Sequence, residues 1–376
     1  MPYREPPASR PYIGGQAVLE GVMMRAPTSF AVVVRRRDGS LQVRERAMVD
    51  TRKGVARWPF VRGVASLVES LKLGSEALRF SADQMERDWV DGEAGDPGPK
   101  GASAGGLGVL GAFGLALVSM VTGDGGASAQ SGGGARKLGT GIMLLVAVGL
   151  FVALPQGAAA GVNRLFHLGL EVQAPAFQAL TGAFKLTIVV SYLLLIRRVP
   201  DIKRVFQYHG AEHKTISTYE AGQPLTVANA RAKTTLHPRC GTTFLVMVAL
   251  VSIVVFITIG AALPRIHTGS ILLDNVAFFL EKLPFLPFIA AVTFEIQRVF
   301  ARTCTTGPLR VVLWPGFLVQ KITTAEPDDA QLEVALASLR VTLFRQEQGQ
   351  SSEMNDDVGF PSYDALLGAE RLRPAA

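Results

Sequence analysis

The sequence predicts an α-helical polytopic membrane protein with about four transmembrane helices, one weak or re-entrant segment and a small cytosolic α+β unit at the N-terminus. Hydrophobic residues make up 48% of the 376 residues and charged residues only 18%, whereas soluble domains carry roughly 25% charged residues. Several apolar runs approach the length of about 20 residues that a membrane-spanning helix needs. The net charge of +7 comes largely from Lys and Arg beside these runs. The lipid bilayer is therefore the expected partner, and nucleic acid is not expected, because the basic segments lack interleaved aromatic residues.

Residues 12–82 are predicted to form the cytosolic α+β unit. Two runs rich in β-forming residues flank the turn-forming pair Asp38-Gly39, which predicts a β-hairpin. Beyond it, apolar residues from Val61 to Leu78 recur at helical spacing and predict an amphipathic helix. Such a helix either lies on the membrane surface or packs on the membrane core, and packing is the preferred interpretation.

Residues 83–137 are predicted to be flexible linkers, because they are rich in glycine. The apolar segment at 105–121 within them is short and interrupted by glycine. We expect it to dip into the bilayer or lie flat, since a full crossing there would place the basic N-terminal unit on the opposite side of the membrane.

The membrane domain is predicted to cover residues 138–303. Its connection at 197–241 and the segment after its last apolar run are rich in Lys and Arg, so both are expected in the cytosol. With four crossings, the N- and C-termini are then cytosolic as well. The four runs predicted to cross are 138–162, 177–196, 242–263 and 283–300.

Residues 304–345 are predicted to form a C-terminal cytosolic segment, followed by a tail at 346–376. Asp328 or Asp329 is suited to cap a helix, and Leu332, Leu336 and Leu339 follow at helical spacing. This amphipathic helix is expected to pack on the cytosolic unit.

The cytosolic connection contains a pattern of metal-binding residue types. His209 and His213 are separated by one helical turn and would project to the same side of a helix. Glu212 lies beside them, so the stretch has the order H-x-x-E-H of inverted zinc proteases, in which two histidines bind zinc and the glutamate is the general base. This pattern alone is weak, because five residues with three fixed positions occur by chance.

A second pair, His237 and Cys240, stands immediately before the third predicted span. Its H-x-x-C spacing allows an imidazole and a thiolate to reach one ion. Four ligands, His209, His213, His237 and Cys240, would form a closed structural zinc site, whereas three ligands and a water would form an open catalytic site with Glu212 as base. Zinc is preferred because a thiolate joins imidazoles, and iron or another transition metal is the alternative.

Simpler interpretations exist for each of these residues. The two histidines of the first pair could be polar residues on a helix at the membrane interface, and Cys240 a small buried side chain. Glu295, inside an apolar run, either pairs with Arg298 or is a further ligand. The remaining residues of these types, His167, His267 and Cys304, have no partner at suggestive spacing and are expected to be structural.

Four stretches carry a family resemblance: GGQAVLEGVMMR at 14–25, DIKRVFQYHGAEHKTISTYEAG at 201–222, LHPRCGTTF at 236–244, and the block at 315–339 that begins PGFLVQKITTAEPDD. With them the chain resembles the YqhQ-like bacterial integral membrane proteins, a family of unknown function often described as predicted metal-dependent enzymes. The resemblance implies the bacterial inner membrane and a metal-dependent activity, without a substrate. A tryptophan expected after Gly316 is missing, and this departure does not touch the candidate ligands.

The two functions expected from these residues are a membrane-embedded zinc-dependent hydrolase and a non-enzymatic scaffold or transporter component. In the hydrolase, Glu212 activates a water at the cytosolic face, and the substrate is unknown. In the scaffold, His209, His213, His237 and Cys240 clamp two spans through a closed zinc site. Either function is compatible with a homo-oligomer.

Overall fold

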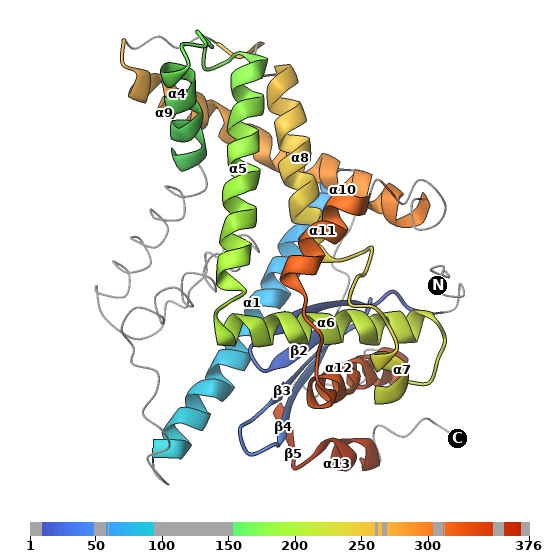
Figure 1. Ribbon diagram of the computed structural model, residues 1–376. Coiled ribbons are helices and arrows are strands. Elements are labelled where there is room, and N and C mark those ends of the chain that lie inside the picture. Colours follow the sequence, from blue (N-terminus) through green and yellow to red (C-terminus); the bar gives the residue numbers. More distant parts are fainter. Residues whose placement is uncertain are drawn as a thin grey trace.

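An antiparallel sheet and its covering helices lie at one end of a group of long apolar helices (Figure 1). The computed structural model describes residues 10–48, 58, 60–93, 153–259, 262–264, 269–303, 311, 313–348 and 357–369. The apolar segment predicted at 105–121, most of the predicted linkers, Cys304 and His267 lie outside these residues.

The sheet has five strands in the order β1-β2-β3-β4-β5, and each neighbouring pair is antiparallel. The hairpin predicted around Asp38-Gly39 is confirmed, and Gly39 has the positive φ of 87° that its turn requires. The last strand comes from the predicted tail, and Asp357 binds the Arg44 guanidinium at 2.7 Å. The strands are β1 (Gly14–Val18), β2 (Gly21–Arg25), β3 (Ser29–Arg35), β4 (Leu41–Ala47) and β5 (Asp357–Phe360).

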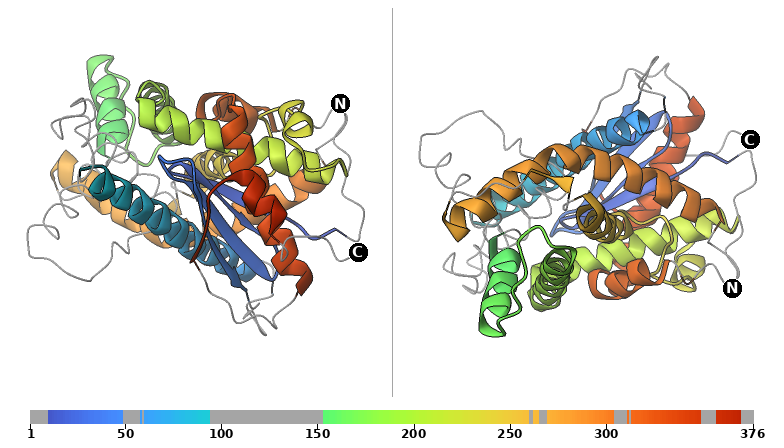
Figure 2. Two further views of the ribbon diagram at one scale, coloured as in Figure 1. Left: turned by 90° about the horizontal axis from the view of Figure 1, so that it is seen from below. Right: turned by 90° about the horizontal axis from the view of Figure 1, so that it is seen from above.

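Helices cover both faces of the sheet (Figure 2). On one face α1 (Val61–Glu93) packs Leu73, Ala77 and Phe80 against the strands. On the other face α12 (Asp329–Gln348) buries an apolar stripe, as its spacing predicts. The short α13 (Tyr363–Gly368) adds to this second core. The chain segments at the two ends of the sequence therefore fold together around one sheet.

Helix α1 is longer than the linker prediction allowed. The linker was expected from residue 83, but α1 continues to Glu93. Gln84 and Asp88 are buried on it, and the Asp88 carboxylate accepts hydrogen bonds from the Arg36 side chain at 2.6 Å and the Arg37 amide at 3.1 Å. These contacts with the β3–β4 turn stabilise helical turns whose sequence resembles a linker.

Two helices are long and apolar enough to cross a membrane: α5 (Pro175–Ile196) and α8 (Gly241–Ile259). A third crossing is formed if the bent pair α9 (Ile271–Lys282) and α10 (Leu286–Thr303), joined by a short turn at Leu283–Phe285, is one broken span. The prediction of four spans is thus not confirmed: the described residues contain two or three candidate spans. The run predicted at 138–162 is described from residue 153 onward, where α4 (Leu154–Leu165) begins.

The apolar helices are joined to the sheet unit by a charged contact. Glu295 of α10 binds Arg62 of α1 at 2.6 Å and also accepts from the Phe60 amide. The guanidinium of Arg62 donates to both oxygens of the Glu295 carboxylate through two nitrogens. The expected pairing of Glu295 with Arg298 is therefore secondary. Glu295 thus links α10 to α1 through an ion pair and lies outside the His/Cys group described below.

Helix α6 (Pro200–Glu220) runs crosswise between the apolar helices and the sheet (Figure 1). It packs on β1, β2 and α12, and Tyr208, Ala211 and Ile216 enter the core shared with α12. The chain then forms α7 (Val227–Arg231) and returns to α8, while α11 (Trp314–Thr323) packs against α8. This arrangement brings α6, the start of α8 and the end of α11 to one point.

Candidate metal centre

His209 and His213 lie one turn apart on α6, as the sequence predicts, and their rings are in contact with centroids 4.4 Å apart. Pro200 in the first turn and Gly222 after the last turn bound the helix that carries them. The His213 side chain is almost completely buried. Because α6 is packed on the sheet and α12, the two rings are held rigidly relative to the rest of the fold.

Cys240, the residue that precedes α8, lies next to the two histidines. Its Sγ atom lies 3.1 Å from Nε2 of His209. One ligand atom each from His209, His213 and Cys240 lies within 4.8 Å of the other two. A metal ion bound to all three would bond imidazole nitrogens at about 2.0–2.1 Å and a thiolate at about 2.3 Å, so three ligand atoms this close together are compatible with one shared ion.

Hydrogen bonds fix which nitrogen of each ring is available. Nδ1 of His209 lies 2.9 Å from the carbonyl oxygen of Thr323, and Nδ1 of His213 lies 2.5 Å from that of Thr235. A carbonyl oxygen only accepts, so each Nδ1 carries a proton, and Nε2 is the nitrogen that is left to bind an ion. Ligating histidines in metal sites are oriented in this way by their second nitrogen.

The Nε2 atom of His213 is buried and forms no hydrogen bond within the described part of the chain. A buried polar nitrogen without a partner costs about 1–3 kcal/mol, and a metal ion would remove this cost. The residues present therefore fit a metal ion, and Nε2 of His213 is the atom that most needs one.

Charge at the site favours a thiolate. Burial raises the pKa of the Cys240 thiol, but the nearby imidazoles of His209 and His213 outweigh burial and hold it well below its usual range. The Thr242 amide, in the first turn of α8, also donates to Sγ at 3.4 Å, and a helix N-terminus stabilises negative charge. Burial lowers the pKa of His209, but the Cys240 thiolate more than offsets this and raises it to about 9.

Glu212 lies on α6 between the histidines and β1, and its side chain is buried. Its carboxylate packs directly against Gly15 of β1: a Cβ atom on Gly15 would lie 2.7 Å from Oε1 of Glu212. Burial raises the pKa of this carboxyl, and the charges of His213 and His209 oppose the rise. It is not part of the three-atom group, and so it is placed beside the candidate ligands and not among them.

His237 has different partners. Its Nε2 lies 3.2 Å from Oε2 of Glu220, and its Nδ1 accepts the Arg239 amide at 3.4 Å. Burial lowers the pKa of His237, so a neutral ring that donates from Nε2 to the carboxylate accounts for both contacts. The structure therefore brings His209, His213 and Cys240 into one group and places His237 beside it, with ring centroids 5.7 Å from His213.

A buried ionic cluster surrounds His237. Glu220 also forms an ion pair with Arg239, and the guanidinium of Arg239 lies 4.8 Å from the ring centroid of Tyr12. The side-chain amide of Gln320 on α11 forms two hydrogen bonds with the backbone of His237. It accepts one from the His237 N–H and donates one to the His237 carbonyl, each at 2.8 Å. We call Glu220, His237 and Arg239 the ion cluster.

Several residues that shape the site have no recognisable sequence signal. Thr235 and Thr323 act through backbone carbonyls, so any residue type could serve there. Gly15 and Gly210 act by lacking a side chain, since a Cβ atom on Gly210 would collide with the Ala325 carbonyl. His167 lies in the turn after α4 with a positive φ of 48° and is remote in sequence from this site.

Comparison with known proteins agrees with the resemblance seen in the sequence. The chain matches the family described as "Protein of unknown function (DUF1385)" over residues 58–345. It is 29% identical over 350 residues to the uncharacterized protein YqhQ of Bacillus subtilis (strain 168), which covers 92% of this chain and 97% of that relative. No solved structure matches the chain. Since this family match covers more than half of the chain and includes all of the metal-ligand candidates, the chain belongs to the DUF1385 family of proteins of unknown function.

Proposed function

We propose that the protein is a membrane-bound, metal-dependent hydrolase whose site lies where α6, α8 and α11 meet. His209, His213 and Cys240 would hold a zinc ion, and Glu212 would act as general base. The observation that carries the proposal is the buried, unpartnered Nε2 of His213, which belongs to a three-atom group with Nε2 of His209 and Sγ of Cys240.

The division of roles follows from the contacts. A zinc ion with three protein ligands lowers the pKa of a bound water towards about 7. Glu212 is suited to accept the proton, because its carboxylate lies on α6 beside His213, next to the three ligand atoms and not among them. The Thr323 and Thr235 carbonyls bind Nδ1 of the two imidazoles, which leaves Nε2 as the nitrogen that would bind the ion.

A structural zinc site is the second candidate. Its supporting observation is that the group joins α6 to the first residue before α8, so a bound ion would tie the connection at 197–241 to the membrane helix. A closed tetrahedral site needs a fourth protein ligand. His237 would have to exchange its contacts with Glu220 and the Arg239 amide to become that ligand.

We further propose that the sheet unit faces the cytosol in the bacterial inner membrane, with both termini on that side. The support is the excess of Lys and Arg between α5 and α8, which includes Arg197, Arg198 and Lys203. Labelling of single cysteines placed in this connection, in intact and in permeabilised cells, tests the orientation. Labelling in intact cells by a reagent that does not cross the membrane would contradict it.

Metal analysis of the purified full chain tests the site itself. The wild type is expected to contain about one zinc ion per chain, and Glu212→Gln to retain it, because Glu212 is placed outside the ligand group. Cys240→Ser is expected to lose the ion. A wild type without bound metal after purification free of chelators would refute both the hydrolase and the structural site.

Cobalt substitution distinguishes the open site from the closed one. Co²⁺ bound to Cys240 is expected to give a thiolate charge-transfer band that is absent in Cys240→Ser. Acetohydroxamate should then change the visible spectrum of the Co²⁺ protein, since an open site has a position for an added ligand. An unchanged spectrum at saturating acetohydroxamate would favour the structural site.

A further inference from the structure

The edge of the sheet that lies beside Glu212 is open to pairing. β1 is the first strand in the sheet order, and among the residues that the structure describes it pairs with β2 alone. In Figure 1 the strands descend from β2 to β5 away from the apolar helices, so β1 is on the side nearest to them. Gly14, Gly15, Gln16 and Ala17 are all partly exposed.

The register identifies which backbone groups of β1 face outward. Val18 and Gly21 close a two-residue turn, and in an antiparallel pair the hydrogen-bonded positions alternate. Val18, Gln16 and Gly14 therefore bond to β2, and the N–H and C=O groups of Gly15 and Ala17 point away from the sheet. Within the described ranges these outward groups form no backbone hydrogen bond with another segment.

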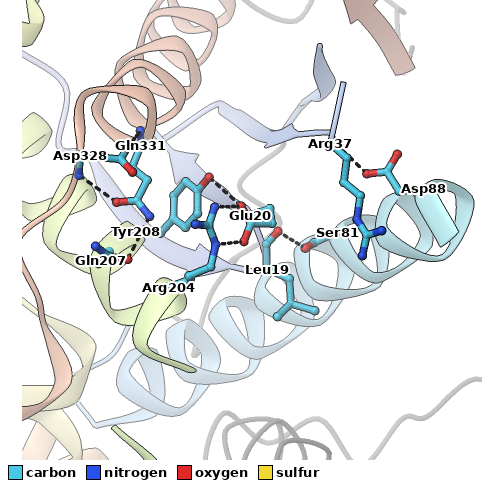
Figure 3. Close-up of polar contacts among 10 residues, drawn as sticks. All are labelled: Leu19, Glu20, Arg37, Ser81, Asp88, Arg204, Gln207, Tyr208, Asp328 and Gln331. Carbon is cyan, nitrogen blue, oxygen red and sulfur yellow. Dashed lines mark hydrogen bonds and ion pairs between the residues drawn. The ribbon is translucent and has the colours of Figure 1, made fainter. Parts of the chain in front are cut away.

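The tip of the β1–β2 hairpin is fastened to α6, as Figure 3 shows. Glu20 has a positive φ of 50° in the turn, an uncommon conformation for a residue other than glycine. Its carboxylate binds the guanidinium of Arg204 and accepts from the Tyr208 hydroxyl at 3.2 Å. At the other end of β1, the Arg10 side chain donates to the carbonyl of Tyr219 at 2.7 Å. β1 is thus held along α6, with Gly15 opposite Glu212.

The outward backbone groups of β1 and the carboxylate of Glu212 lie next to each other. Gly15 offers outward backbone groups, and the carboxylate of Glu212 packs against the same residue. An extended peptide that adds to this edge would run beside the proposed base and the His/Cys group. Proteins commonly bind extended peptides in this way, with main-chain hydrogen bonds supplying affinity.

We propose that the substrate is a polypeptide, bound as an extended strand along the outer edge of β1 through the backbone groups of Gly15 and Ala17. This rests on the proposed hydrolase function and makes it a peptide-bond hydrolase. The position of β1 on the side of the sheet nearest the apolar helices suits a segment that enters from a membrane protein. The reaction would add water across the amide: the scissile C–N bond breaks, the carbonyl carbon gains the hydroxyl, and the leaving nitrogen gains the proton.

The test compares two hydroxamates on the Co²⁺-loaded full chain, with dissociation constants read from the visible spectrum. Acetohydroxamate reports only the metal position, whereas acetyl-Ala-Leu-Ala hydroxamate adds an extended backbone. The peptide compound is expected to bind roughly tenfold more tightly or better, since two main-chain hydrogen bonds are gained. N-methylation of its backbone amides should remove this gain, and this comparison uses the wild-type protein alone.

Ala17→Pro removes the outward N–H without breaking the ladder to β2, because proline is tolerated on edge strands. This variant should bind acetohydroxamate like the wild type and lose the gain for the peptide compound. Ala17→Ser retains the N–H and is the control.

Three outcomes separate the possibilities. If acetohydroxamate does not bind the wild type, the proposed function fails. If acetohydroxamate binds but the peptide compound gains nothing, or its gain survives N-methylation, the peptide proposal alone fails. If Ala17→Pro instead converts a dimer to a monomer in light scattering, the occupant of the edge is a second copy of this chain and the proposal is overturned.

Discussion

The group of His209, His213 and Cys240 and the adjacent ion cluster of Glu220, His237 and Arg239 both contain histidines, but these histidines differ in what they contact. In the first, each Nδ1 donates to a backbone carbonyl and each Nε2 faces the other ligand atoms. In the ion cluster, Nε2 of His237 faces the Glu220 carboxylate. A buried histidine with a carboxylate partner is already satisfied, whereas one with an unpartnered nitrogen is prepared for a metal ion.

The largest expected effect comes from breaking the ion cluster. Glu220→Ala leaves Arg239 and His237 without their buried carboxylate, and Glu220 is only 5% exposed. Removing one partner of a buried pair costs about 3–5 kcal/mol, which thermal unfolding in detergent would measure. The comparison predicts that any folded Glu220→Ala protein still binds metal. Loss of metal without loss of stability would show that the two clusters are one site.

The second effect tests the difference between the histidines directly. His213→Ala should weaken metal binding by more than about 100-fold, because loss of an outer partner alone typically costs 10–100-fold. His237→Asn is the matched control and should retain the metal, since Nε2 of His237 lies against Glu220 and His237 is not part of the three-atom group. Competition with a chelator of known affinity measures both. Equal losses in the two variants would place His237 among the ligands.

The sequence was most informative where the signal is local. The Asp38-Gly39 turn, the spacing of apolar residues in α1 and α12, and the turn that separates His209 from His213 each depend on residues close in the chain. The family resemblance rests on such stretches and is confirmed.

Contacts between distant segments could not be predicted. The partner of His237 depends on how the chain folds back after α7, and H-x-x-C spacing alone favoured a metal for both residues. In the same way, Arg62 from a distant helix is the main partner of Glu295, and its neighbour Arg298 is secondary. Strand β5 has only four residues and forms because β4 offers an edge.

A smaller effect is expected at the contact that fixes α6 against the hairpin. Glu20→Gln removes the charge that binds Arg204, whose side chain is 48% exposed, and weakens the contact to the buried Tyr208 hydroxyl. We expect a loss of roughly 1–2 kcal/mol, since solvent screens the exposed part. The His/Cys group and the ion cluster both lie on or beside α6. Metal affinity and the stability contributed by the ion cluster should therefore decrease together in this variant. The control Asp357→Asn, at a similarly exposed pair on β4 and β5, should cost under about 1 kcal/mol, as is typical of an exposed ion pair.

The last prediction concerns the protonation of Cys240 in the metal-free protein. The imidazoles of His209 and His213 lower its pKa, so the thiolate should persist as the pH falls through the range in which an ordinary thiol, with a pKa near 8.5, is already protonated. The rate of alkylation by iodoacetamide, followed on the Cys240 peptide by mass spectrometry, is limited by burial of Cys240 and should therefore fall little between neutral and mildly acidic pH. His209→Ala removes the imidazole 3.1 Å from Sγ and should shift the profile to higher pH. His237→Asn should shift it less, because the thiolate has its closest histidine contact with His209 and not with the ion cluster. Equal shifts in the two variants would mean that both clusters act on Cys240 alike, and the distinction between them would fail.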